Sequence, residues 1–263
     1  MKHKDQLERV LELKDTPTRI VSLVPSQTEL LVDLGLESSI VGVTKFCIHP
    51  ASLRKNKTVV GGTKQVRFDK IKNLNPDIIL CNKEENTKEM ILELENIAPV
   101  HISDIYNLDD ALELLDLYGQ LFSVEKKSEV LISSIKNKYR DFRHHIKDQP
   151  KLKVAYFIWK NPWMVAAKDT FIDDMLRVNG FKNYFGDLER YPEVDFNSIT
   201  EELDVILLSS EPYPFKSAHI KELKAQFPNT KTILVDGEFF SWYGSRLEHA
   251  FDYFKILRQE LLG

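Results

Sequence analysis

The sequence predicts an α/β protein built from two lobes with mostly parallel sheets, joined by one long helix. Apolar β-branched runs alternate with stretches of helical periodicity, which is typical of parallel strands covered by helices. Between residues 108 and 146 the periodicity is helical with no strand, and the alternation then resumes. We therefore expect an N-terminal lobe over residues 1–123, a linker helix over 124–149 and a C-terminal lobe over 150–263.

The stretch RIVSLVPSQTELLVDLGL, residues 19–36, predicts the first strand and the first helix. Its first half is apolar and largely β-branched, as in a buried parallel strand, and Pro25 ends the run. Ser26 and Glu29 have the spacing of a capping box, in which each side chain bonds a backbone N–H of the other residue. Gly35 suits the left-handed residue that follows a helix.

The rest of the first lobe continues the alternation. Strands are expected in SIVGV (39–43), at Asp77–Cys81 and in PVHIS (99–103). A short helix is expected before the second of these strands and an amphipathic helix in NTKEMILELENIA (86–98). The expected order is therefore strand and helix in turn, which favours a parallel sheet.

A similar order recurs past Pro150. Thr170 and Asp173 repeat the capping spacing, and Gly180 stands where a helix would end. The segment FNSITEELDVILLSS (196–210) sets Phe, Ile and Asp before an apolar strand, as FDKIKNLNPDIILCN (68–82) does. Further strands are expected in KVAYFIW and KTILVDG. The recurrence indicates two similar lobes.

Composition excludes several classes of protein. A net charge of −4 gives no electrostatic reason to expect binding to nucleic acid. Cys47 and Cys81 are the only cysteines and form no CxxC pair, so no disulfide framework is expected. The first residues lack the apolar core of a signal peptide, and no apolar run is long enough to insert in a membrane. On these grounds we expect a cytoplasmic protein.

Aromatic residues gather in the loops that follow the strands of the second half. In open parallel sheets, ligands bind beyond the carboxyl ends of the strands. Large rings have little reason to collect in surface loops, so the set favours a cleft for a flat, largely apolar ligand. For any single ring, packing beneath its own loop is an equal alternative. The set comprises Trp159, Trp163, Tyr191, Tyr213, Phe215, Phe239, Phe240, Trp242 and Tyr243.

Polar residues beside these rings suggest contacts with the same ligand. Arg246 could bind a carboxylate, phosphate or propionate with two parallel hydrogen bonds, or it could be a surface arginine. Glu211 is a candidate polar anchor, although a helix-start carboxylate is slightly favoured. Cys47 and His49 are possible metal ligands, but two ligands without a third are weak evidence. No nucleophile elbow, phosphate-binding loop or paired carboxylates are found.

The chain resembles the substrate-binding proteins of ABC importers for cobalamin, iron–siderophores and haem, the helical-backbone (cluster III) group. The resemblance spans nearly the whole chain, and the cobalamin-binding members are the nearest comparison. It implies two Rossmann-like lobes bridged by a rigid helix, with the ligand between them and no intrinsic cofactor. The motifs that carry it are RIVSLVPSQTELLVDLGL, FDKIKNLNPDIIL, TFIDDMLRVNGFKNYF, YPEVDFNSI and DGEFFSWYGSRL.

The resemblance also implies roles for individual residues. The PSQ turn borders the ligand in the family, His49 and Lys64 fall at or near aromatic contact positions, and Asn82 stands where a tryptophan is expected. Tyr191 keeps the aromatic character of its position. The ligand-binding residues that we expect are Pro25, Ser26, Gln27, His49, Lys64, Trp163, Tyr191, Glu211, Phe240, Trp242, Tyr243 and Arg246.

Importer-bound relatives dock onto permease arginines through one acidic residue on each lobe. Asp69 fits the first position; Asn197 occupies the second, with Asp195 close by. We therefore expect a non-catalytic protein that binds a cobalamin-like corrinoid, an iron–siderophore or haem, with an ABC permease as a possible partner. The alternative is an intracellular enzyme or chaperone for such a chelate. In that case Cys47 and His49 would be the reactive groups, with Lys45 lowering the pKa of the thiol.

Overall fold

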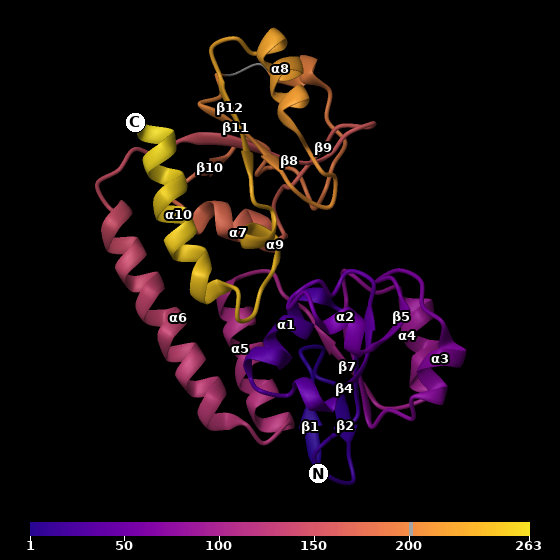
Figure 1. The fold of residues 1–263 in the computed structure, drawn as a ribbon. Helices are drawn as coiled ribbons and strands as arrows, with labels where there is room; N and C mark the ends of the chain where they lie inside the picture. Colours follow the sequence, from indigo (N-terminus) through magenta and orange to yellow (C-terminus); the bar gives the residue numbers. More distant parts are fainter. Residues whose placement is uncertain (200–201) are drawn as a thin grey trace. The chain divides into compact units, whose positions relative to one another are not determined.

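The computed structural model describes residues 1–199 and 202–263, and Figure 1 shows their fold. The chain divides into two compact α/β units, which confirms the predicted fold class. Two residues of the repeated segment 196–210, Thr200 and Glu201, lie outside the described residues. Unit 1 comprises Met1–Ile105, Asp109–Ile135 and Tyr243–Arg246, and unit 2 comprises Tyr106–Leu108, Lys136–Trp242 and Leu247–Gly263.

The sheet of unit 1 is parallel throughout and has the strand order β5-β4-β3-β6-β7. Its central strands are short and fully buried, as their apolar, β-branched sequences predict. All five carboxyl ends therefore meet at one edge of the sheet. The strands are β3 (Ile20–Ser22), β4 (Ile40–Thr44), β5 (Thr58–Gly61), β6 (Ile78–Asn82) and β7 (Val100–Ser103).

Helices cover both faces of this sheet (Figure 1). One face packs Val21, Ile79 and Ile102 against apolar residues of α3 and α4. On the other face Tyr118 of α5 packs edge-on against His101 of β7. The helices are α1 (Pro25–Asp33), α2 (Leu53–Asn56), α3 (Phe68–Asn73), α4 (Lys88–Glu95) and α5 (Leu108–Leu121), with a 3-10 turn η1 (Glu37–Ser39).

Unit 2 has a second sheet, with the order β10-β8-β11-β12 and β9 paired antiparallel to β8. The pairs β10–β8, β8–β11 and β11–β12 are parallel, so the carboxyl ends of β8, β11 and β12 also share an edge. The strands are β8 (Lys153–Trp159), β9 (Met164–Val165), β10 (Lys182–Asn183), β11 (Val205–Ser209) and β12 (Lys231–Val235).

Helices of unit 2 bury the two faces of this sheet. Leu223 of α8 joins the apolar cluster around Phe157 and Leu208. On the other face Phe240 contacts both Tyr156 of β8 and Phe254 of α10. The helices are α7 (Phe171–Val178), α8 (Ser217–Gln226), α9 (Glu238–Ser241) and α10 (Leu247–Leu262), with a 3-10 turn η2 (Phe196–Ser198).

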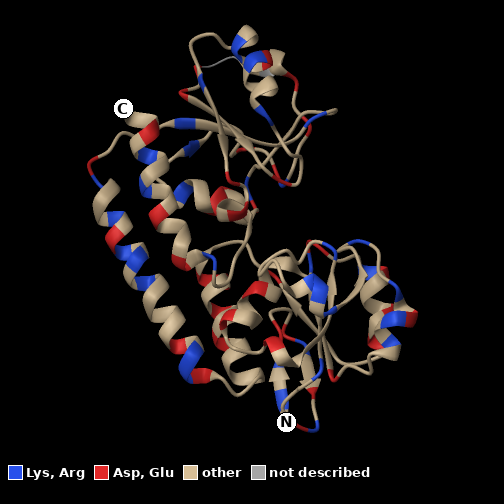
Figure 2. Cartoon of the chain, in the orientation of Figure 1, with Lys and Arg blue, Asp and Glu red and all other residues tan. Residues whose placement is uncertain are grey.

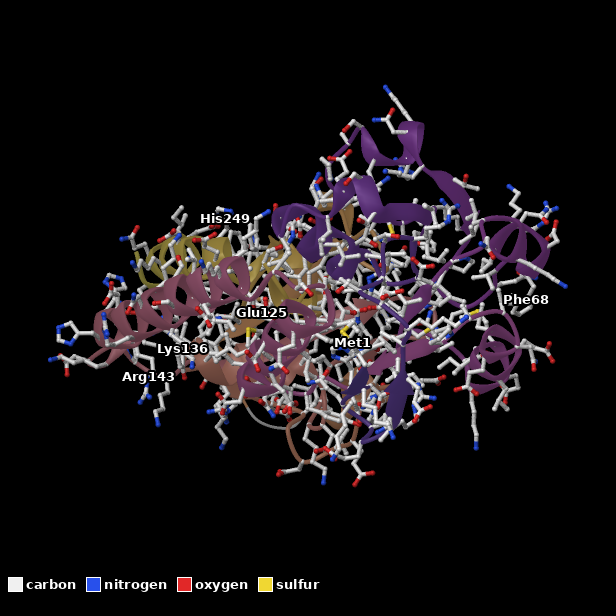
Figure 3. The ribbon with its side chains drawn as sticks, turned by 90° about the horizontal axis from the view of Figure 1, so that it is seen from below. Met1, Phe68, Glu125, Lys136, Arg143 and His249 are labelled. Carbon is white, nitrogen blue, oxygen red and sulfur yellow. The ribbon has the colours of Figure 1, made fainter. Side chains whose placement is uncertain are left out.

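The long helix α6 spans Glu125–Ile146, within the range 124–149 where a linker helix was expected. Residues up to Ile135 belong to unit 1, and Lys136 begins the part that belongs to unit 2. Charged residues follow one another along its length (Figure 2), and Glu125, Lys136 and Arg143 are labelled on it in Figure 3. None of the helices in the described ranges is long and apolar enough to cross a membrane.

The capping prediction was wrong for the first helix and right for its counterpart. Helix α1 begins with Pro25 in its first turn, and its N-cap residue Val24 makes no side-chain cap. Glu29 instead bonds Arg246. In α7 the Thr170 side chain accepts a hydrogen bond from the backbone N–H of Asp173, as predicted. Proline fits the first helical turn without a hydrogen-bonding cap because its position needs no N–H donor.

Glycines end both helices in the left-handed conformation, as predicted. Gly35 has φ +80° and Gly180 has φ +70°. The sequence did not predict the small antiparallel hairpin at the N-terminus, formed by β1 (Lys2–Lys4) and β2 (Val10–Glu12). Its strands of three residues are too short and too polar to show a hydrophobic alternation.

Candidate functional site

The carboxyl edge of the sheet in unit 1 contains a buried network centred on Gln27. Its amide nitrogen donates to the Ser103 hydroxyl at 2.5 Å and to the Tyr243 hydroxyl at 3.3 Å. Its amide oxygen accepts from the Tyr118 hydroxyl at 2.7 Å. Gln27, Tyr118 and Ser103 are fully buried. Gln27 therefore fixes the turn after β3 and holds Tyr243 in unit 1.

Pro25 and Ser26, also predicted to border the ligand, are buried in the first turn of α1. Asn82 is the last residue of β6, and its side chain binds the backbone of the following loop. Its side-chain oxygen accepts hydrogen bonds from the backbone N–H groups of Glu84 and Glu85 at 2.8 and 3.1 Å. The Lys64 ammonium donates to the carbonyl of Glu84. These two polar residues thus hold loops at the edge of the sheet.

Arg246 and Glu29 form a fork-to-fork ion pair within unit 1. The guanidinium Nε and Nη2 lie 2.9 and 2.7 Å from the two carboxylate oxygens of Glu29. The side chains are only 11% and 17% exposed. Burial raises the pKa of Glu29, and the paired Arg246 opposes this shift. The geometry gives Arg246 a carboxylate of the protein itself as its bidentate partner.

In unit 2, Glu211 anchors the segment that leads to Trp242. Its Oε1 atom accepts from the indole Nε1 of Trp242 at 2.9 Å and from the Ser241 hydroxyl at 2.5 Å. Burial raises the pKa of Glu211, and the two hydrogen bonds lower it in part. Trp242 is 7% exposed. Glu211 thus anchors Ser241 and Trp242, and its hydrogen bonds go to side chains of the protein itself.

Several of the predicted loop rings pack against other side chains of the protein. Trp163 stacks on Phe215 with ring centroids 5.8 Å apart and planes at 10°, and it also contacts Phe157 edge-on. Phe240 is fully buried in unit 2, and Tyr243, which belongs to unit 1, is 5% exposed. The rings of Trp163, Phe240 and Tyr243 therefore take part in packing within their units.

Trp159, by contrast, is exposed at the carboxyl end of β8. Its side chain is 40% exposed, and its ring meets Tyr213 edge-on at 5.6 Å. Tyr213 in turn packs against Phe215 at 4.7 Å. The position of Trp159 beside a loop does not distinguish it from the rings that are buried. The signal in the sequence that could have predicted its exposure is that it is the last residue of a strand. Among the loop rings named for unit 2, Trp159 is exposed, and the others are buried or partly buried.

Tyr191 belongs to a small cation–π cluster of unit 2. The guanidinium of Arg190 lies 5.7 Å from the Tyr191 ring centroid and 5.8 Å from that of Tyr106. Arg190 also donates to the carbonyl of Asp169 at 2.9 Å. Tyr191 is partly exposed, so part of its aromatic ring lies on the surface of unit 2, as the ring of Trp159 does.

The loop after β4 places Phe46 and Ile48 on the surface of unit 1, with 48% and 36% exposure. The sequence pattern pointed to their neighbours Cys47 and His49 instead. His49 is partly exposed, but Cys47 is fully buried. Burial raises the pKa of the Cys47 thiol, which is the opposite of the lowered pKa that a reactive thiolate beside Lys45 would need. No group of three or more possible metal-ligating side chains occurs among the described residues.

The two candidate docking residues are both exposed. Asp69 lies in the first turn of α3 and pairs with Arg67, which lowers the pKa of the carboxyl. Its neighbour Phe68 is 38% exposed at the outer rim of unit 1 (Figure 3). Asp195 precedes η2 and accepts from the backbone N–H of Asn197 at 3.0 Å, which lowers the pKa of its carboxyl.

Comparison with known proteins assigns the chain to a family. The family model described as "Periplasmic binding protein" matches residues 20–232. The chain belongs to this family. It is therefore a binding protein and not an enzyme, of the kind that captures substrates for ABC transporters. The alternative of a chelate-modifying enzyme is thereby overturned.

Relatives and solved structures agree with this assignment. An ABC transporter substrate-binding lipoprotein of Bacillus subtilis, YvrC, is 29% identical over 191 residues, which are 70% of this chain and 60% of YvrC. The vitamin B12-binding protein of Pectobacterium carotovorum is 22% identical, covering 88% of this chain and 84% of its own length. A possible iron-binding, periplasmic solute-binding protein of Staphylococcus epidermidis superposes with a TM-score of 0.79 at 25% identity, covering 95% of this chain and all of the other.

The periplasmic haem-binding protein RhuT of Roseiflexus superposes with a TM-score of 0.82 at 19% identity, covering 93% of this chain and 99% of its own. At this identity the likeness shows the shared fold. The expectation of a cytoplasmic location is wrong, because the matched family consists of periplasmic binding proteins and YvrC is a lipoprotein. The first residues of a sequence are weaker evidence about location than family membership.

Proposed function

We propose that this chain binds a metal chelate of the corrinoid, haem or ferric-siderophore class and delivers it to an ABC permease. The names of the relatives support this class: one binds vitamin B12, one haem, and one is described as possibly iron-binding. The cobalamin-like ligand expected from the sequence is one member of it. We place the contacts at the carboxyl edge of each sheet.

The observation that carries this proposal is the exposed ring of Trp159. A large aromatic side chain at 40% exposure leaves apolar area in water unless a ligand covers it. The edge-on contact with Tyr213 holds the indole ring in place, so little freedom is lost when a flat ligand stacks on it. Tyr191 offers a further aromatic face in the same unit.

Delivery would involve the exposed acidic residues Asp69 and Asp195. The carboxyl pKa of each is lowered, so each carries a full negative charge at neutral pH. An exposed carboxylate of this kind suits a basic patch on a permease. The proposal therefore separates two roles: the sheet edges bind the chelate, and the acidic residues dock the protein.

Titration of the purified protein with cyanocobalamin, haemin and a ferric siderophore tests the proposed function. Tryptophan fluorescence is the readout, because an absorbing chelate on Trp159 quenches it. We expect one of the three to bind with a dissociation constant below about 10 μM, a free energy of roughly −7 kcal/mol. Absence of binding by all three at that concentration would refute the proposal.

Replacing Trp159 with alanine is expected to weaken binding by about 1–3 kcal/mol, because a stacked ring is lost. The matched control is Leu234→Ala, which removes another exposed apolar side chain of unit 2, 42% exposed. Its affinity should equal that of the wild type. If the two variants bind alike, Trp159 is not a ligand contact.

A further inference from the structure

The loop that follows β4 in unit 1 combines exposed apolar side chains with the ammonium group of Lys45. Phe46 is 48% exposed and Ile48 is 36% exposed, two positions apart, while Cys47 between them is fully buried. The alternation presents a ring and an aliphatic side chain on the surface and turns the middle residue inward. The loop stands at the carboxyl edge of the sheet, where ligands of parallel sheets bind.

Backbone hydrogen bonds hold this loop rigidly. The N–H of Lys45 donates to the carbonyl of Gly61 at 2.8 Å, and its carbonyl accepts from Arg54 Nη1 at 2.9 Å. The N–H of Phe46 donates to the Thr44 hydroxyl at 3.2 Å. The exposure of Phe46 is therefore a property of a fixed loop, and the ring is preorganised for contact.

The buried thiol of Cys47 also helps to hold this loop in place. Cys47 Sγ lies 3.1 Å from the Thr28 hydroxyl oxygen and 3.3 Å from that of Thr44, and the Cys47 N–H donates to the Thr44 carbonyl at 3.2 Å. These contacts tie the loop to α1 and β4 from beneath. Cys47 is thus a positioning residue for the two side chains that flank it.

Lys45 gives the surface a positive charge. Its ammonium lies 4.9 Å from the centroid of the Phe46 ring, and in the described part of the chain it has no ion-pair partner. Two other cations of unit 1 at this edge have carboxylate partners, since Arg246 pairs with Glu29 and Lys83 with Asp104. Lys45 therefore remains available to an anionic group that comes to rest beside the ring.

We propose that residues 45–48 form a contact site for the chelate and that this site selects ligands bearing a carboxylate at the rim of a flat apolar ring system. Phe46 and Ile48 cover the face of the ligand, and the ammonium of Lys45 pairs with the carboxylate. This inference rests on the proposed function and goes further, because it distinguishes acidic chelates from amide-substituted ones.

The test compares haemin with its bis(ethanolamide), which keeps the ring and the iron but lacks both carboxylates. Binding to the wild-type protein is measured by quenching of tryptophan fluorescence and by the absorbance of the haemin. We expect haemin to bind about fivefold to tenfold more tightly than the bis-amide, the effect of one partly shielded ion pair. The preference should decrease as salt is added.

Two pairs of variants separate the charge from the ring. Lys45→Gln should bind haemin and the bis-amide equally, with unchanged affinity for the bis-amide, whereas Lys55→Gln, an exposed lysine of α2, should behave as the wild type. Phe46→Ala should weaken both probes by about tenfold. Phe68→Ala, which removes an exposed ring of α3, is its control.

The outcomes distinguish this inference from the proposed function. If haemin binds but Lys45→Gln keeps the full preference over the bis-amide, the inference is overturned and the proposed function stands. The same holds if Phe46→Ala binds both probes as the wild type does. If haemin, cyanocobalamin and a ferric siderophore all fail to bind the wild type, the proposed function and this inference fall together.

Discussion

Replacing Asp5 with alanine is expected to lower the free energy of unfolding of unit 1 by about 3–5 kcal/mol, because it removes the acceptor of three backbone N–H groups. The Asp5 side chain is completely buried, and its Oδ2 lies 2.8 Å from Nε of Arg9. Its Oδ1 accepts from the backbone N–H groups of Leu7 and Arg9, each at 3.0 Å. Alanine would leave these donors unpaired.

Asp5 also belongs to a cap on the free edge of the sheet. Strand β7 is an edge strand, and its outward backbone groups would be open to another chain. The Ile102 N–H donates to Asp5 at 3.2 Å, and the Val100 carbonyl accepts from Arg9 Nη2 at 2.6 Å. The Asp104 N–H donates to Gln6 at 3.2 Å. The loss of Asp5 is therefore expected to promote aggregation as well.

Urea unfolding followed by circular dichroism and by fluorescence checks this prediction. All three tryptophans lie in unit 2, so fluorescence reports on that unit, while circular dichroism reports on both. Asp5→Ala should lose stability by circular dichroism before fluorescence changes. Asp15→Ala, an exposed carboxylate near the same hairpin, should stay within about 0.5 kcal/mol of the wild type. Equal midpoints for the two variants would contradict the role given to Asp5.

Elements with a strong hydrophobic period or a clear helix-end residue could be predicted from the sequence. Elements that depend on contacts between residues far apart in the sequence could not. The strand after Arg19 and the helix end at Gly35 follow from local patterns, and both were found. The N-terminal hairpin was missed because the side chains of Asp5 and Arg9 find their hydrogen-bond partners on strand β7, about 90 residues away in sequence. No local pattern contains that information.

The same limit applies to the site. The sequence located the loops at the carboxyl edges, but it could not show which rings turn inward. Trp163 stacks on Phe215 and is partly buried, whereas Trp159 ends its strand exposed. Arg246 has a carboxylate partner, Glu29, that lies more than 200 residues earlier. The residue types in these loops predict which kinds of contact are available. Tertiary packing decides which of these side chains a ligand can reach.

Acid is expected to destabilise unit 1 through His101, the second large effect. The side chain is 1% exposed on β7, and neither ring nitrogen has a hydrogen-bond partner among the described residues. Burial lowers the pKa of His101 to about 4, and nearby Asp5 opposes this shift while Arg9 and His3 add to it. The folded protein therefore holds this imidazole neutral at a pH where the unfolded chain, with an ordinary pKa, protonates it.

Because the folded pKa lies below the unfolded one, stability is full above about pH 6.5 and falls as the pH drops towards 4. The loss amounts to about 2 kcal/mol at pH 5 and about 3 kcal/mol at pH 4. Urea unfolding at pH 8 and pH 5, followed by circular dichroism, measures it. His101→Leu should lose less stability than the wild type over this interval, since it has nothing to protonate there. The control is His249→Leu, which alters an exposed histidine of α10 (Figure 3) and should retain the acid sensitivity. A wild-type protein equally stable at both pH values would contradict the buried neutral state of His101.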